Sequence, residues 1–391
     1  MKHKALLERH TGLYTDFYEL TMAQGYFLTG RTDIPACFDY FFRTIPFQGG
    51  YVIFSGLYDL LSFIENLKFD ENEIVYLESL GFDKRFLEYL KEFHFRGDIY
   101  SFSEGEIAFP YEPLLRVEGN IIEAQIVETV VLNILNFESL ITTKAVRIKQ
   151  AAGDKTVIDF GLRRAQGFGG IHASRAAGIG GILKTSNVYS AYIFGLEPSG
   201  TMAHSWVQSF DDELSAFREF ARIYPEKSVL LVDTYDTLNS GIPNAIKVAK
   251  ELEKKGYRLV GIRIDSGDLA YLSKKARKML DEAKLNYVKI IVSNQLDEYV
   301  IKSLVEQNAP IDVFGVGTRL VTGYEDGALD GIYKLSMSEN KPRLKKSETV
   351  EKIGLPGIKK TVRFINDEGK FYADAIMLND ENKINEIFRL K

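Results

Sequence analysis

His204 is the first candidate for chemistry, because of the segment in which it lies. It follows the strand-like run Ser199–Ala203, which ends in small residues, and it precedes Ser205 and Trp206 at the start of a helix-like segment. An imidazole exchanges a proton near neutral pH, so a histidine at a strand end is suited to catalysis. A lone histidine is more often structural, so His204 needs matching groups at other strand ends.

Carboxylates follow two further apolar, strand-like runs. Asp233 and Asp236 come after one run, and Asp265 and Asp268 come after the next. Such carboxylates can hold the hydroxyls of a sugar, or Mg²⁺ through waters and substrate oxygens. A plainer interpretation is that Ser266 or Asp268 caps a helix, and we expect this for at least one of them.

Arginines and a glycine-rich turn indicate an anionic ligand. Arg163, Arg164 and Arg263 lie at strand ends, and a guanidinium group matches the planar oxygens of carboxylate or phosphate. Gly317 and Thr318 close a Gly-x-Gly-Thr sequence whose backbone N–H groups and hydroxyl suit a phosphate. Taken singly, Arg163 could be a surface charge and the glycines could only form a turn.

Two aromatic residues and one serine complete the candidate groups. Phe160 ends the first strand-like run of the alternating region, and Tyr18 lies at the start of a helix-like segment. Either ring could stack on a flat ligand. Ser186 lies in the polar cluster Thr185–Asn187, which follows the strand-like run Gly178–Leu183. Together these groups favour a phosphorylated sugar and a small planar acid as ligands.

The elements that must position these residues are short buried strands that alternate with helices. This alternation is typical of right-handed βαβ units and a parallel sheet. No Rossmann glycine fingerprint follows the first strand, which favours a closed or nearly closed, irregular seven-stranded α/β barrel. The predicted strands are Thr156–Phe160, Gly178–Leu183, Ser199–Ala203, Val229–Val232, Leu259–Ile264, Val288–Val292 and Asp312–Val316.

The two ends of the chain predict a second, α+β domain. Residues 11–30 are expected to form a helix in which Asp16 and Glu19 make a capping box. The expected domain boundaries give an N-terminal domain of residues 1–125, a barrel of 126–323, and C-terminal strands of 324–391 that pack with the N-terminal domain. The further elements are strand 36–43, helices within 57–96, strands within 97–119, a long helix Ile121–Ala152, and antiparallel strands Tyr333–Ser336, Thr361–Ile365 and Lys370–Met377.

The composition gives no indication of nucleic-acid or membrane binding. The 391 residues are 45% apolar and carry a net charge of −5, so no basic footprint is present. No apolar run reaches the ~18 residues of a spanning helix, and the charged N-terminus MKHKALLERH lacks a signal-peptide core. Cys37 is the single cysteine, which excludes internal disulfides and cysteine-cluster zinc sites. We therefore expect a cytoplasmic protein without zinc.

Taken together, these segments resemble the nicotinate phosphoribosyltransferases, a family of type II phosphoribosyltransferases. The resemblance runs from residue 14 to beyond residue 320, and it implies an irregular barrel and a domain built from both chain ends. It also implies a homodimer or higher homo-oligomer with shared active sites. Some archaeal members carry a cysteine zinc knuckle that this sequence lacks. The matching segments are Tyr14–Met22, Asp159–Gly167, Gly200–Trp206, Val232–Thr237, Arg263–Asp268 and Phe314–Thr318.

The resemblance implies a reaction of nicotinate with phosphoribosyl pyrophosphate, which yields nicotinate mononucleotide and pyrophosphate. ATP hydrolysis would drive it, with Mg²⁺ present. ATP would phosphorylate His204, and Asp233 would orient that histidine. Arg263 and Asp265 would hold the phosphoribosyl group, with Gly317–Thr318 at its 5′-phosphate.

The resemblance also assigns the groups around the pyridine ring. Phe160 and Tyr18 would sandwich the ring, with Tyr18 supplied by the neighbouring subunit. Arg163 would face the carboxylate of nicotinate. Arg43 would reach in from the neighbouring subunit.

Several rival functions stay open from the sequence. Nicotinamide phosphoribosyltransferases have a related layout with an aspartate at the position of Ser186, so the serine favours the acid as substrate. Quinolinate phosphoribosyltransferases share the fold class but lack the His204 motif. The segment Val229–Thr237 faintly resembles the phosphoribosyl pyrophosphate loop of type I phosphoribosyltransferases, but it lacks the adjacent acidic pair of that loop. A non-catalytic barrel that senses a nucleotide is the alternative outside the enzymes.

Overall fold

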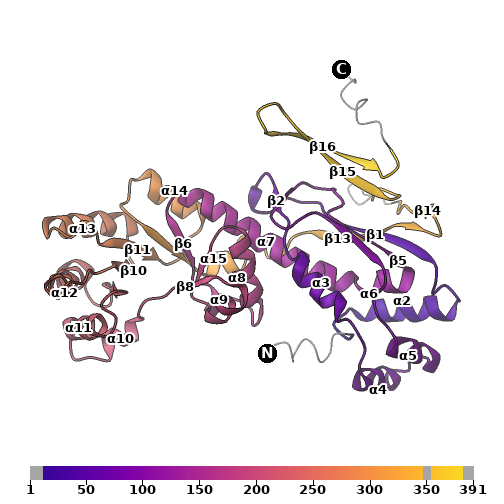
Figure 1. Cartoon of the computed structure of the whole chain (residues 1–391), viewed down its shortest axis with the longest axis horizontal. Coiled ribbons are helices and arrows are strands. Elements are labelled where there is room, and N and C mark those ends of the chain that lie inside the picture. Colours follow the sequence, from indigo (N-terminus) through magenta and orange to yellow (C-terminus); the bar gives the residue numbers. More distant parts are fainter. Residues whose placement is uncertain (1–11, 347–353, 382–391) are drawn as a thin grey trace. The chain divides into compact units, whose positions relative to one another are not determined.

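The computed structural model describes residues 12–346 and 354–381, so the segment MKHKALLERH lies outside the described residues. The chain divides into two compact units (Figure 1). We call Met1–Leu140 with Ala328–Lys391 the terminal unit, and Ile141–Gly327 the barrel unit. The sequence-based boundaries lay near residues 125 and 323, whereas the first division falls inside helix α7 (Glu128–Ala152).

A five-stranded antiparallel sheet joins the two ends of the chain in the terminal unit. Its central strand pairs along its length with a strand from the C-terminal part, from Ala36 opposite Ser338 to Phe42 opposite Gly331. The prediction that C-terminal strands pack with N-terminal ones is confirmed by this pairing. In sheet order the strands are β14 (Lys341–Pro342), β13 (Gly331–Ser338), β1 (Pro35–Phe42), β5 (Leu115–Asn120) and β3 (Asp98–Ser101).

Among the described residues of the terminal unit, the other elements are helices and two small sheets. In Figure 1 the hairpin of β15 and β16 lies on one side of the large sheet, and α2 and α6 lie on the other. The core, which is rich in buried aromatic rings, includes residues of the large sheet and of the helices. These elements are α2 (Phe17–Leu28), α3 (Leu57–Glu65), α4 (Glu71–Ser79), α5 (Lys84–Lys91), α6 (Ile121–Ile126), the pair β2 (Val52–Ile53) with β4 (Ile107–Ala108), and the hairpin β15 (Lys359–Ile365) with β16 (Phe371–Leu378).

The capping box predicted for Asp16 and Glu19 is wrong. Asp16 occupies the N-cap position of α2, but its side chain makes no capping hydrogen bond. Instead it accepts a hydrogen bond from the Thr129 hydroxyl at 3.3 Å. Glu19 is fully buried and accepts a hydrogen bond from Gln125 at 2.6 Å. Packing of α2 against α6 and α7 therefore takes both side chains away from the local motif.

The barrel unit contains a parallel seven-stranded sheet, which confirms the predicted irregular α/β barrel. Within the described residues β8 and β9 end the strand order without pairing to each other, so the sheet is a curled half-barrel. In sheet order the strands are β8 (Glu197–Pro198), β7 (Lys184–Thr185), β6 (Thr156–Asp159), β12 (Val313–Val316), β11 (Lys289–Ser293), β10 (Gly261–Ile264) and β9 (Val229–Leu231).

The helices of the barrel unit lie between its strands in the sequence, as the alternation predicted. Most run from 7 to 14 residues, while α10 has 5 residues and α15, which closely follows β12, has 4. They are α8 (Gly169–Ile179), α9 (Val188–Phe194), α10 (His204–Gln208), α11 (Glu213–Ile223), α12 (Ile242–Lys254), α13 (Leu269–Glu282), α14 (Glu298–Glu306) and α15 (Thr318–Val321).

Two of the seven predicted strands are wrong. Gly178–Leu183 is the end of α8 and its turn, and the strand is the two-residue β7 that follows. A Cβ atom on Gly180 would lie 2.6 Å from the Cβ of Ala145, so this glycine serves close helix packing. Ser199–Ala203 is likewise no strand, because β8 ends at Pro198.

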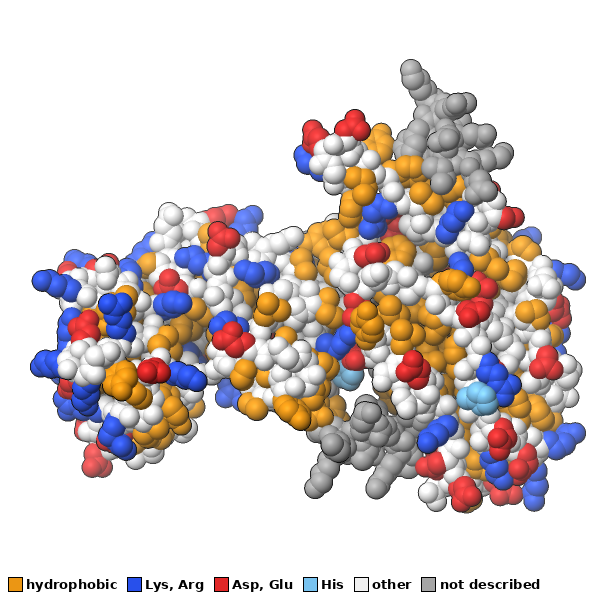
Figure 2. All heavy atoms as spheres, viewed as in Figure 1, with side chains coloured by type: hydrophobic (Ala, Val, Ile, Leu, Met, Phe, Trp, Pro, Cys, Tyr) orange, Lys and Arg blue, Asp and Glu red, His pale blue; other side chains and the backbone are white. Residues whose placement is uncertain are grey.

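The stretch Ile121–Ala152 is long and apolar enough to cross a membrane by length and composition alone. Its most apolar window has a mean hydropathy of 1.3, but 61% of that window is buried inside the structure. A core helix has this pattern. Figure 2 shows acidic and basic side chains interspersed over the visible face of each unit.

Candidate functional site

A cavity of about 130 Å³ lies at the carboxyl ends of strands in the barrel unit, and we call it the mouth cavity. Parallel strands of an α/β barrel place their functional loops at this end. The cavity brings together predicted site residues from three strand ends: Phe160, Arg163, Arg263, Asp265, Gly317 and Thr318. The other lining residues are Arg164, Ser293, Asn294, Gln295 and Gly315.

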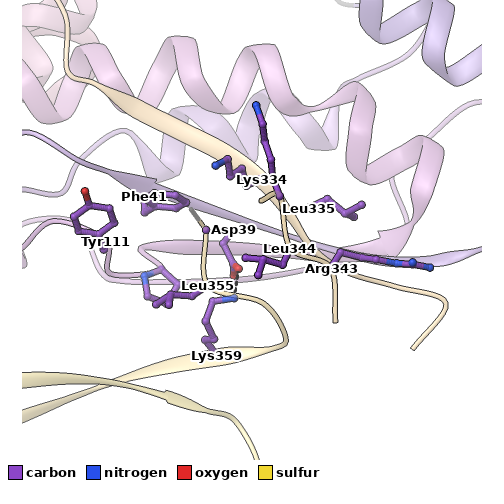
Figure 3. Close-up of a pocket in the computed structure, with 12 residues that line it drawn as sticks. Asp39, Phe41, Tyr111, Lys334, Leu335, Arg343, Leu344, Leu355 and Lys359 are labelled. Carbon is purple, nitrogen blue, oxygen red and sulfur yellow. Dashed lines mark ion pairs between the residues drawn. The ribbon is translucent and has the colours of Figure 1, made fainter. Parts of the chain in front are cut away.

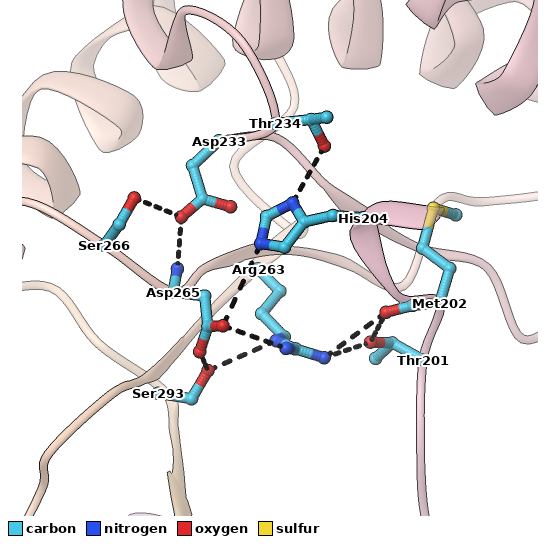
Figure 4. A network of polar contacts seen from close by, with 9 residues as sticks. All are labelled: Thr201, Met202, His204, Asp233, Thr234, Arg263, Asp265, Ser266 and Ser293. Carbon is cyan, nitrogen blue, oxygen red and sulfur yellow. Dashed lines mark hydrogen bonds and ion pairs between the residues drawn. The ribbon is translucent and has the colours of Figure 1, made fainter. Parts of the chain in front are cut away.

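The guanidinium group of Arg263 is held from several sides (Figure 4). Its Nε donates to the hydroxyl of Ser293 at 3.2 Å. Its Nη1 donates to the hydroxyl of Thr201 at 2.8 Å and to the carbonyl of Met202 at 3.4 Å. The guanidinium carbon lies 5.6 Å from the centre of the Phe160 ring. These contacts fix the guanidinium group of Arg263 near the ring of Phe160, which is expected to stack on the substrate.

Asp265 links Arg263 to the histidine. Its Oδ1 accepts a hydrogen bond from Ser293, and its Oδ2 lies 3.5 Å from Nη2 of Arg263. The same Oδ2 lies 4.0 Å from Nε2 of His204. One carboxylate thus faces both the arginine and the imidazole.

The other ring nitrogen of His204 contacts Thr234. Its Nδ1 lies 3.0 Å from the Thr234 hydroxyl. Asp233, which the sequence resemblance assigned to this histidine, accepts hydrogen bonds from the Asp265 backbone at 2.8 Å and the Ser266 hydroxyl at 2.6 Å. Figure 4 shows this arrangement. The structure therefore places Thr234 at the ring nitrogen, and Asp233 one step away in the network.

His204 is placed by a helix start rather than by a strand end. It is the first residue of α10, and Ala203 occupies the N-cap position. The strand predicted before it is absent, but His204 still lies beside Asp265, because α10 begins there. We call the contacts that join His204, Asp265, Arg263 and Ser293 the mouth network. Asp236 and Asp268, also considered for chemistry, cap the backbone N–H groups of Asn239 and Tyr271. The expected N-cap role is thereby confirmed for Asp268.

Two glycines of the predicted motifs are explained by close approach. A Cβ atom on Gly315 would lie 2.5 Å from atoms of the Phe160 ring. A Cβ atom on Gly161 would lie 2.0 Å from Val321. Any larger residue at either position would displace the Phe160 ring or the chain that follows it.

Asp159 is a site residue that the sequence reasoning missed. Its side chain is 1% exposed and accepts three hydrogen bonds. The donors are the Gly161 backbone at 2.8 Å and the hydroxyls of Ser174 and Thr185, each at 2.7 Å. This carboxylate fixes the turn that presents Phe160. The only sequence signal was an aspartate directly before Phe-Gly at the end of a buried strand.

The remaining predicted residues of the barrel unit lie at three places. Arg163 belongs to an exposed 3₁₀ turn, Leu162–Arg164. Gly317 precedes α15, and Thr318 is its first residue. Ser186 follows β7 and donates its backbone N–H to the Asp159 carbonyl at 2.8 Å. It is not among the residues that line the mouth cavity.

Tyr18 and Arg43 belong to the terminal unit. Tyr18 is 47% exposed, and its hydroxyl donates to Glu128 at 3.0 Å. Burial of the hydroxyl, and then the carboxylates of Glu128 and Glu19, raise the pKa of Tyr18. Arg43 follows β1, and its Nε is buried without a hydrogen-bond partner within the described residues.

A larger cavity of about 390 Å³ lies in the terminal unit (Figure 3). Asp39 in its wall forms an ion pair with Lys359 at 2.6 Å. Phe41, Tyr111 and Leu355 contribute apolar surface. None of the predicted site residues lines this cavity, so the mouth cavity remains the candidate active site.

Asp265, which lines the mouth cavity, and Asp233, which accepts its backbone N–H, have the ligand chemistry of a divalent-cation site. The Oδ1 of Asp233 is buried and accepts no hydrogen bond within the described parts of the chain. Asp265 is partly exposed nearby in the same network. Carboxylate oxygens are the ligands that Mg²⁺ prefers, usually together with waters and substrate phosphates.

Two family models cover most of the chain. The nicotinate phosphoribosyltransferase N-terminal domain matches residues 13–136, and the nicotinate phosphoribosyltransferase family matches residues 156–344. The nicotinate phosphoribosyltransferase of Bacillus subtilis is 46% identical over 386 residues, which are 97% of this chain and 78% of that protein. Nicotinate phosphoribosyltransferase pncB2 of Mycobacterium tuberculosis is 42% identical over 96% of this chain and 80% of its own length.

Two solved structures share the fold over almost the whole chain. Human nicotinic acid phosphoribosyltransferase superposes with a TM-score of 0.85 and 31% identity, covering 94% of this chain and 82% of that one. Nicotinate-nucleotide pyrophosphorylase from Pyrococcus furiosus superposes with a TM-score of 0.76 and 26% identity, covering 95% of this chain and 84% of that one.

Proposed function

Because this chain belongs to the nicotinate phosphoribosyltransferase family, we propose that it makes nicotinate mononucleotide from nicotinate and phosphoribosyl pyrophosphate. Pyrophosphate is the second product, and ATP hydrolysis drives the reaction through a phosphorylated His204. The observation that carries the proposal is the network joining His204, Asp265 and Arg263 at the mouth cavity.

The proposed chemistry is displacement at the anomeric carbon of the ribose. The bond from this carbon to the pyrophosphate oxygen breaks, and a bond to the pyridine nitrogen forms. The nitrogen lone pair is already available, so no general base is required. The site has to align the two reactants and stabilise the charge that develops on the departing pyrophosphate.

The side chains of the mouth supply this alignment. Phe160 offers a ring face for the pyridine, and Gly315 leaves room for the Phe160 ring. Arg163 offers an exposed guanidinium for the nicotinate carboxylate. Arg263, held in place from several sides, supplies positive charge to the phosphoribosyl group. Gly317 and Thr318 supply backbone N–H groups and a hydroxyl for the 5′-phosphate.

Asp233 and Asp265 are the residues that would hold Mg²⁺. A bound magnesium ion neutralises phosphate charge and orients the pyrophosphate group. The free Oδ1 of Asp233 supports this assignment.

His204 is the proposed acceptor of the ATP phosphoryl group. In that step a ring nitrogen forms a bond to the γ-phosphorus, and the bond to the departing ADP oxygen breaks. Water later takes the phosphoryl group, which gives phosphate and restores the imidazole. The contacts of the two ring nitrogens with Thr234 and Asp265 hold the ring for this transfer.

We also propose a homodimer in which Tyr18 and Arg43 complete the site of a second copy. The exposure of Tyr18 supports this, because 47% of the residue is accessible to a second copy. Tyr18→Ala and His204→Ala chains, mixed under conditions that exchange subunits, should then recover part of the activity lost by each. No recovery despite demonstrated exchange contradicts the shared site.

The function is tested with nicotinate, nicotinamide and quinolinate, each with phosphoribosyl pyrophosphate, with and without ATP. We expect nicotinate to be preferred and ATP to stimulate its turnover. His204→Ala should lose the stimulation and keep its fold. Preference for nicotinamide would identify the nearest rival, and ligand binding without any product would indicate a sensing protein.

A further inference from the structure

Ser293 has an unusual position in the mouth network. It is the last residue of β11, and its side chain is 4% exposed. Its neighbour on β12 is Gly315, the glycine that leaves room for the Phe160 ring. The hydroxyl therefore lies at the base of the site, between groups proposed to bind substrate.

The hydroxyl of Ser293 bridges two charged residues. It accepts a hydrogen bond from Nε of Arg263 at 3.2 Å, and it donates its proton to Oδ1 of Asp265. A serine hydroxyl has one proton and can accept through its oxygen, so both capacities are used here. The single proton of Ser293 is therefore used within the network, so this hydroxyl does not donate a hydrogen bond to a ligand in this arrangement.

The bridge fixes the direction of both partners. With Oδ1 of Asp265 bound to Ser293, Oδ2 is the oxygen left for Arg263 Nη2 and His204 Nε2, at 3.5 and 4.0 Å. With Nε of Arg263 bound to Ser293, Nη1 is directed to Thr201. Loss of the hydroxyl removes one restraint from each charged group, while the backbone of β11 keeps its pairing.

We propose that Ser293 is a positioning residue for phosphoribosyl pyrophosphate, acting through Arg263 and Asp265. The inference rests on the proposed function, which assigns Arg263 to the phosphoribosyl group and Asp265 to the Mg²⁺ that accompanies phosphoribosyl pyrophosphate. Hydrogen bonds to charged groups contribute enough that we expect Ser293→Ala to weaken binding of this ligand about tenfold to a hundredfold. A merely structural serine would lower stability without this selectivity.

The test is calorimetric titration of phosphoribosyl pyrophosphate with Mg²⁺ into the folded full chain. The variants are Ser293→Ala, Asp265→Ala and the double variant. The matched control is Ser273→Ala, which removes another fully buried serine hydroxyl, one that donates within α13. We expect the control to bind within about twofold of wild type, because it lies outside the network.

The double variant separates positioning from a structural role. If Ser293 acts largely through Asp265, the double variant binds within about threefold of Asp265→Ala alone, although Ser293→Ala by itself has a large effect. Full additivity, or binding by Ser293→Ala equal to wild type, overturns the inference. Wild-type binding without formation of nicotinate mononucleotide would instead contradict the proposed function alone, since the titrations still test Ser293.

Discussion

The Nδ1 of His204 lies 3.0 Å from the hydroxyl of Thr234, while its Nε2 faces Asp265. A hydroxyl can donate to a bare nitrogen or accept from a protonated one, so Thr234 suits either tautomer. The ring is therefore held by a neutral partner on one side and a charged one on the other.

Removal of the Thr234 hydroxyl should impair the use of ATP. Thr234→Val keeps the shape of the side chain but loses the hydrogen bond, so ATP stimulation should fall about fivefold to twentyfold. The rate without ATP should stay unchanged. Thr234→Ser keeps the hydroxyl and serves as the control. Initial rates with and without ATP measure this, and wild-type stimulation in Thr234→Val would rule out a role for the contact.

Asp159→Asn should destabilise the chain and loosen the nicotinate site. The two carboxylate oxygens of buried Asp159 accept three hydrogen bonds, whereas an asparagine has a single acceptor oxygen and an NH2 group that only donates. We expect a loss of about 1–3 kcal/mol in unfolding free energy, and a raised KM for nicotinate because Phe160 follows directly. Urea unfolding and steady-state kinetics measure the two effects. The exposed Asp154→Asn is the control, and equal behaviour of both variants would refute the role of Asp159.

Glu19 should make stability depend on pH. Burial, and then the carboxylate of Glu128, raise the pKa of Glu19 to about 7. Because the folded pKa exceeds the unfolded value of 4.5, the group's contribution is intact below pH 4.5 and is lost as pH rises through 7. Glu19→Gln removes this loss. The unfolding free energy of the variant minus that of wild type should therefore be larger at pH 8 than at pH 5, by up to about 3 kcal/mol.

Thermal unfolding midpoints of wild type and Glu19→Gln at pH 5 and pH 8 test this. Glu92→Gln, at an exposed position of the same unit, is the matched control and should show no such trend. A midpoint difference between Glu19→Gln and wild type that is the same at both pH values would contradict the assignment.

Ser186→Asp should shift substrate preference from the acid toward the amide. Two like charges ~4 Å apart cost roughly 4 kcal/mol at an effective dielectric constant near 20. After partial protonation or rearrangement, we expect kcat/KM for nicotinate to fall about tenfold to a thousandfold. Ser186→Asn, of the same size without charge, is the control. An unchanged ratio of kcat/KM for nicotinate and nicotinamide would show that Ser186 does not face the ring substituent.

The fold could be predicted where buried runs are long enough to show a pattern. The sequence segments that form β9, β10, β11 and β12 contain several apolar residues in succession. The observed bounds of these strands lie within two residues of the predicted ones. The strands β7 and β8 have only two residues each, and Gly180, just before β7, serves helix packing. No local pattern distinguishes such strands from turns.

The site shows a similar division. The charged residues Arg263 and Asp265 could be predicted because polar groups at strand ends converge in a barrel. The hydroxyl of Ser293 contacts a side chain of the neighbouring strand β10, and that of Thr234 contacts the first residue of α10. Those contacts depend on strand register and side-chain direction, which the sequence alone does not specify.

The most direct test is the rate of nicotinate mononucleotide formation by wild type, Asp265→Asn and Asp268→Asn, measured by chromatography with nicotinate, phosphoribosyl pyrophosphate, Mg²⁺ and ATP. Asp268 caps α13, and asparagine caps equally well, so Asp268→Asn should match wild type. Asp265→Asn removes the charge that faces Arg263 and His204, so we expect a loss of about a hundredfold or more. Absence of product from wild type, or full activity in Asp265→Asn, would contradict the account.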